Sequence, residues 1–93
     1  MRRKLFTVDG VFNISGRGIV ISGEIEPNSP SYKAGAIVVL VTPNGNELVA
    51  EIGGLERIKP LDIENFNRKK VGVMLKGVTE KTGIPIGTEV FLE

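Results

Sequence analysis

The stretch that decides the fold is Val11-Phe-Asn-Ile-Ser-Gly-Arg-Gly-Ile-Val-Ile-Ser-Gly-Glu-Ile-Glu26. Apolar residues alternate with other residues on both sides of Gly16-Arg17-Gly18, which is typical of strands with one buried face. The two glycines can adopt positive φ, so the pattern predicts a sharp reversal that holds the Arg17 side chain outward. The predicted inward residues are Phe6, Val8, Phe12 and Ile14 on the first strand and Ile19, Ile21 and Ile25 on the second.

The rest of the chain also indicates strands and turns. The further predicted strands cover residues 37–42, 48–58, 71–78 and 88–92. Asn44-Gly45 predicts a two-residue hairpin turn with positive φ at both residues. Gly53-Gly54 predicts a bulge inside a strand, because glycine at such a position accompanies a bend. We therefore expect an all-β chain with short connections.

Length and composition predict one domain, residues 1–93. The chain has 93 residues, of which 41% are hydrophobic, enough for a single core. No apolar run approaches the roughly 18 residues of a membrane span. The basic start Met1-Arg-Arg-Lys4 is not followed by a sustained apolar segment, so we expect no secretory signal and a cytoplasmic protein.

Several kinds of chemistry are disfavoured by the residues present. The chain contains no His and no Cys, which excludes imidazole-dependent triads and most zinc sites. The glycine pair at Gly16 and Gly18 begins a dinucleotide-binding pattern, but Ile21 stands where the third glycine is required. Lys81-Thr82 is preceded by Glu80, where a P-loop requires glycine. We expect no catalysis, no cofactor and no metal.

Ordered motifs along the chain resemble those of a known domain family. The opening stretch resembles V-F-x-I-x-G-R-G-x-V-x-x-G-x-[IV]-E, the start of the second domain of the translational GTPases, typified by elongation factor Tu. Later segments resemble its other motifs in order: Lys33-Ala-Gly35, Gly54-Leu-Glu56, Val71-Gly-Val-Met-Leu-Lys-Gly-Val78 and Ile86-Gly-Thr-Glu-Val90. The resemblance implies a closed six-stranded antiparallel Greek-key β-barrel, here as a stand-alone domain without the GTPase domain.

The resemblance also implies a function in translation. In the full-length factors this barrel helps to hold the aminoacylated 3′ end of tRNA or contacts rRNA, and packs on the GTPase domain. Positions that match those lining the 3′-adenosine pocket of the tRNA carriers are Ile14, Val20, Ser22 and Glu56. Two positions differ from the carriers: their acidic pair before Val-Phe is Asp9-Gly10 here, and their asparagine before Val-Gly-Val is Lys70.

Two classes of function follow. The first is binding of RNA (tRNA or rRNA) or the ribosome, with phosphate contacts from Arg17 and from Arg57, Lys59, Arg68, Lys69, Lys70 and Lys76. Alternative interpretations are that Arg17 and Glu56 serve as structural ion-pair partners and that the basic residues form a solvated face, since the net charge is only +1. The second class is docking on a GTPase or ribosomal protein through exposed residues among Val20, Val38, Leu40, Val49 and Met74.

Overall fold

The computed structural model describes residues 2–14, 18–57, 70–78 and 83–93 and, within these, the side chains of all residues except Glu56 and Arg57. The described strands are β1 (Arg3–Thr7), β2 (Gly10–Ile14), β3 (Gly18–Glu24), β4 (Ile37–Val41), β5 (Glu47–Arg57), β6 (Lys70–Lys76) and β7 (Glu89–Leu92). They form one antiparallel sheet in the order β1-β7-β4-β5-β6-β3-β2. The prediction of an all-β antiparallel chain is confirmed. None of the described segments forms a helix with the length and hydrophobicity that a membrane crossing requires.

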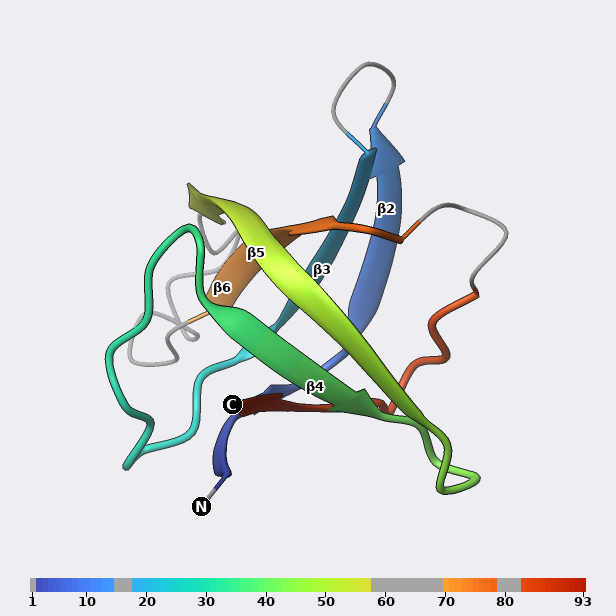
Figure 1. Ribbon diagram of the computed structural model, residues 1–93, viewed down its shortest axis with the longest axis horizontal. Coiled ribbons are helices and arrows are strands. Elements are labelled where there is room, and N and C mark those ends of the chain that lie inside the picture. The colour runs from blue at the N-terminus through green and yellow to red at the C-terminus, as the bar shows by residue number, and fades with distance from the viewer. Residues whose placement is uncertain (1, 15–17, 58–69, 79–82) are drawn as a thin grey trace, which may run out of the picture.

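The sheet curls on itself, so that β4 and β5 lie in front of β2 and β3 (Figure 1). The strand ladder has two ends, β1 and β2, and is not closed by hydrogen bonds into a ring. A single bridge between Phe6 and Ile25, with a 2.9 Å hydrogen bond from Glu26 N to Leu5 O, links β1 to the chain just beyond β3. The described residues thus form seven strands, where the sequence predicted six for the whole chain.

The additional strand arises because the predicted first strand changes its partner between Val8 and Asp9. Val8 N donates to Thr88 O at 2.8 Å, next to the start of β7, whereas Asp9 N donates to Ser22 O of β3 at 2.8 Å. The prediction placed Phe12 and Ile14 inward by carrying the alternation through this point, and it was wrong. Phe12 is 50% exposed and Ile14 36% exposed. In β2 the residue that packs on the core is Val11. The inward-facing positions therefore change from even-numbered residues before Asp9 to odd-numbered residues after it.

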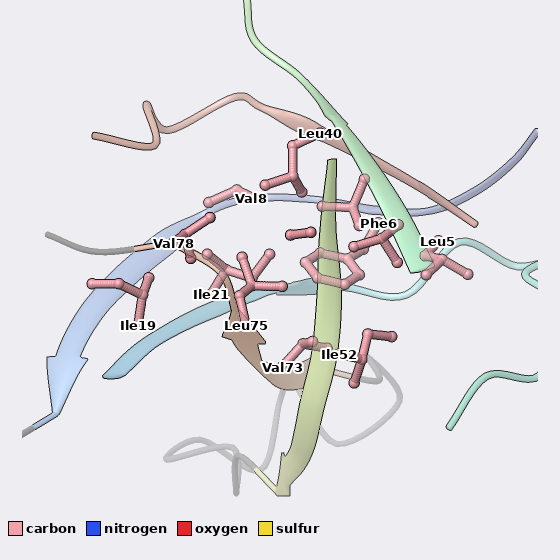
Figure 2. Close-up of a cluster of buried hydrophobic side chains, with 13 residues drawn as sticks. Leu5, Phe6, Val8, Ile19, Ile21, Leu40, Ile52, Val73, Leu75 and Val78 are labelled. Atoms are coloured by element: carbon pink, nitrogen blue, oxygen red, sulfur yellow. The ribbon is translucent and has the colours of Figure 1, made fainter. Parts of the chain in front are cut away.

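The core lies inside the curled sheet and is built from nearly every strand (Figure 2). It consists of Leu5, Phe6, Val8, Ile19, Ile21, Val38, Leu40, Ala50, Ile52, Val73, Leu75, Val78 and Val90. The predicted inward positions Phe6, Val8, Ile19 and Ile21 are confirmed. Because a strand alternates its side chains, these residues also fix which neighbours point outward from each strand.

The predicted hairpin and bulge are both present. Thr42 N donates to Asn46 O at 2.8 Å and closes the turn between β4 and β5. Only Gly45 adopts positive φ, at 89°, and Asn44 does not, so the turn is not the predicted two-residue form. The register of β5 on β6 shifts between Ile52 and Gly54, as expected for a bulge at the glycine pair.

Candidate functional site

The outward face of β2, β3 and β6 carries two adjacent rows of residues. In the first row, Val20 lies between Phe12 on β2 and Met74 on β6. In the second row, Ser22 lies between Gly10 and Gly72. We call the second row the glycine–serine strip. Two of its three residues lack a side chain, but the strip is largely covered: Ser22 is 4% exposed, Gly72 is buried and Gly10 is half-buried.

The Phe12 ring lies along the glycine–serine strip. A Cβ atom on Gly10 would stand 3.1 Å from Cε2 and Cζ of Phe12 and 2.7 Å from Ser22 Oγ. The ring therefore occupies the space that a side chain at position 10 would need. Phe12 itself is 50% exposed, which leaves an aromatic surface open to solvent beside a strip that is itself largely buried.

Asp9 borders the strip and joins two polar groups. Ser22 Oγ donates a 2.8 Å hydrogen bond to Asp9 Oδ1, and Lys70 Nζ forms a 3.2 Å ion pair with Asp9 Oδ2. Ser22 is 4% exposed, so its hydroxyl depends on this carboxylate. The Lys70 and Asp9 side chains are 40% and 41% exposed, and the ammonium group is therefore accessible from solvent. Asp9 and Lys70, far apart in the sequence, thus form one ion pair beside the strip.

A shallow open pocket of about 500 Å³ adjoins this cluster. Its lining residues are Thr7, Val8, Asp9, Glu24, Ile25, Glu26 and Pro27. Three carboxylates line it, and they disfavour a phosphate group. Among the described residues no group of three or more His, Cys, Asp or Glu is arranged to hold a metal ion.

The predicted RNA-binding residues fall into three groups. Val20 and Ser22 lie on the predicted outward face, but they are only 3% and 4% exposed. Ile14 is exposed at the end of β2, and Lys70 lies beside the strip. Glu56 and Arg57 belong to β5, opposite Gly72 and Val71, and their side chains lie outside the described part, as do Arg17, Lys59, Arg68 and Lys69.

The residues predicted for protein docking also separate. Val38 and Leu40 are fully buried in the core, and Val20 is nearly so; these three cannot contact a partner. Val49 is 63% exposed on the outward face of β5, and Met74 is half-buried, with its Cε 3.3 Å from the position of a Cβ on Gly54. Only Val49 and Met74 remain available.

Sequence reasoning missed Phe12, Gly10 and Asp9 as site residues. Phe12 was assigned to the core, since nothing in the alternation itself marks the change of partner after Val8. Asp9-Gly10 offered a signal, because a carboxylate followed by glycine in an otherwise apolar strand is unfavourable in a strand interior.

The chain matches no known protein-family model.

Proposed function

We propose that the chain is a translation-type β-barrel module that binds RNA, either tRNA or rRNA, at the ribosome in the cytoplasm, and that it performs no catalysis. The ordered motifs and the antiparallel all-β sheet support this fold assignment. The contact surface would comprise the Phe12 ring and Lys70.

The half-exposed Phe12 ring beside the strip carries the proposal. An unpaired base stacks on an aromatic ring regardless of its identity, with about 1–3 kcal/mol per base. The ring lies along Gly10, so a nucleotide would contact the ring and not the strand backbone beneath it. A terminal or looped single strand fits this geometry, because its bases are free to leave the stack.

Lys70 supplies the phosphate contact. Its partner Asp9 competes for the ammonium group, but an exposed ion pair of this kind contributes only about 0–1 kcal/mol. The ammonium group has three N–H donors, so a phosphate oxygen can bind Lys70 Nζ while Asp9 keeps its own contact and its hydrogen bond from Ser22 Oγ.

The test is a titration of fluorescently labelled tRNA, with the same tRNA lacking its single-stranded 3′ end as a comparison. Phe12→Ala should weaken binding about tenfold, because one stacking contact is lost. Lys70→Met should lower the slope of affinity against salt by about one phosphate contact. Arg17→Ala combined with Lys70→Ala should lower the slope further.

Val49→Ala is the matched control, because Val49 is an exposed apolar residue on β5, away from the strip. It should bind RNA like the wild type. A wild-type protein without salt-dependent association with either RNA near physiological ionic strength would refute the proposed function.

A further inference from the structure

The outward face of β7, β4 and β5 carries a regular pattern of apolar and acidic residues. Because Val38, Leu40, Ala50 and Val90 point into the core, the alternate residues of these strands point outward. The outward residues, in register, are Glu89, Phe91 and Glu93 on β7, Val41, Val39 and Ile37 on β4, and Glu47, Val49 and Glu51 on β5. We call this surface the β4 face. Figure 1 shows β4 and β5 lying across the front of the molecule.

The β4 face has an apolar centre that extends in two directions. Val39 is directly paired with Phe91 on one side and with Val49 on the other. Ile37 and Val41 continue the apolar row along β4. Val39 is 0% exposed although it lies outside the core cluster, whereas Val49 is 63% and Ile37 40% exposed. The centre is thus preformed, and its outer residues are open to solvent.

Four carboxylates occupy the corners of this face. Glu89 and Glu47 flank Val41, while Glu93 and Glu51 flank Ile37. With strands about 4.8 Å apart and a rise of about 3.3 Å per residue, the corners lie about 10 Å apart across the strands and about 13 Å apart along them. An apolar centre with acidic corners disfavours RNA and anionic lipid surfaces, because both carry negative charge.

Three of the four corner glutamates already form ion pairs with cationic side chains that do not belong to the β4 face. Arg2 Nη1 lies 2.7 Å from Glu47, Lys4 Nζ lies 3.5 Å from Glu89, and Lys76 Nζ lies 3.8 Å from Glu51. Burial alone would lower the pKa of Lys4, but hydrogen bonds and charges from Glu26 and Glu89 raise it overall. All these pairs are solvent-exposed and contribute little stability. The corner carboxylates can therefore exchange their partners for cations on another molecule.

We propose that the β4 face docks an amphipathic helix of a partner protein, whose aliphatic stripe covers Val49 and Ile37 and whose flanking Lys or Arg residues reach the corner glutamates. A helix is about 10 Å wide, which matches the separation of the corners across the strands. Cations on both flanks of an aliphatic stripe complement this charge pattern. A second copy of this chain fits less well, because it would bring carboxylates against carboxylates.

This docking surface is independent of the proposed RNA site, which lies on β2, β3 and β6. The probes are two synthetic helical peptides of equal length, one with Leu on one face and Lys on its flanks, the other with Glu in place of Lys. Binding is followed by the methyl NMR signals of the Ile- and Val-labelled protein. The Leu–Lys peptide should shift the signals of Ile37, Val39, Val41 and Val49, and the Leu–Glu peptide should not.

Val49→Lys should weaken binding of the Leu–Lys peptide about tenfold, because it places a cation in the apolar centre. The matched control is Ile86→Lys, since Ile86 is 60% exposed and lies outside the β4 face; it should bind like the wild type. Glu47→Gln with Glu51→Gln should reduce the salt dependence. RNA binding by Val49→Lys should be unchanged, which separates this inference from the proposed function.

The inference is overturned if both peptides shift the same signals. It is also overturned if Val49→Lys and Ile86→Lys weaken binding equally, or if the shifts fall on the methyl groups of Val20 and its neighbours instead of the β4 face.

Discussion

Gly23 lies directly against the backbone of Thr7, at the place where the end of β3 passes β1. A Cβ atom at position 23 would collide with the carbonyl oxygen of Thr7 and would stand 2.5 Å from Cδ2 of Phe6. Phe6 is itself fully buried, and it forms the bridge to Ile25. The absence of a side chain at Gly23 is therefore what allows the end of β3 to approach β1.

Gly23→Ala should lower the free energy of unfolding by about 3 kcal/mol or more, because the methyl group must displace backbone and a core ring. Gly54→Ala is the control: its Cβ would meet only the flexible end of Met74, at 3.3 Å, and should cost less than about 1 kcal/mol. Urea unfolding measures both. Equal losses in the two variants would contradict the close approach at Gly23.

Asp9→Ala should destabilise the protein more than removal of its ion pair alone predicts. It leaves the Ser22 hydroxyl, which is 4% exposed, without its carboxylate partner, and a buried hydroxyl without a partner costs about 1–3 kcal/mol. Lys70→Met removes only the exposed ion pair and should cost less than about 1 kcal/mol.

The double variant Asp9→Ala with Ser22→Ala separates the two contributions, because it removes both partners of the hydrogen bond. It should be less destabilised than the sum of the single variants. Strict additivity in chemical denaturation would show that the Ser22 hydroxyl finds another partner.

Thr88→Val should cost about 1–2 kcal/mol although the two side chains are nearly equal in shape. Thr88 is fully buried, and its Oγ1 donates a 2.7 Å hydrogen bond to Pro85 O. Valine cannot make this bond, and the turn before β7 loses an anchor. Thermal unfolding measures the change. An unchanged midpoint would mean that the 3.2 Å bond from Thr88 N to Pro85 O holds the turn by itself.

The phenol of Tyr32 should titrate at a higher pH in the folded protein than in the unfolded chain. Burial raises the pKa of Tyr32 above its ordinary value of 10.0, because the charged phenolate is poorly solvated against the core. The contribution of the neutral phenol to the free energy of unfolding is fully present below the pKa of Tyr32 in the unfolded chain, about 10. It is lost as the pH rises through the pKa of Tyr32 in the folded protein.

Tyr32 is the only tyrosine and the chain has no tryptophan, so phenolate absorption reports this residue alone. The native midpoint should exceed the midpoint in denaturant. Tyr32→Phe should reduce the loss of stability at alkaline pH, and a native midpoint at or below the denatured one would contradict the burial of this ring.

The sequence predicts much of the fold because local signals agree with one another over most of the chain. Alternation identifies the inward face of β3 through Ile19 and Ile21, and the glycine pair Gly53-Gly54 marks the bulge in β5. Alternation misassigns Phe12, because the backbone changes its hydrogen-bond partner after Val8. That change depends on the distant strands β7 and β3 and not on the neighbouring residues. The alternation of neighbouring residues cannot show with which of two distant strands a segment will pair.

The candidate surfaces were less predictable than the fold. Val20 and Ser22 point outward as expected, but both are almost completely buried. The pairing of Asp9 with Lys70 joins residues far apart in sequence, and the acidic corners around Val39 follow from the register of three strands. Register is a property of the assembled sheet, so these groupings emerge only in three dimensions.

Because the backbone changes its hydrogen-bond partner between Val8 and Asp9, the number of residues at that point decides which side chains β2 exposes. Addition or loss of one residue there would turn every side chain of the following segment over. Val11 would then face water, and the ring of Phe12 would enter an interior that is already filled. Natural variation in length should therefore be tolerated in the turns and not at this junction.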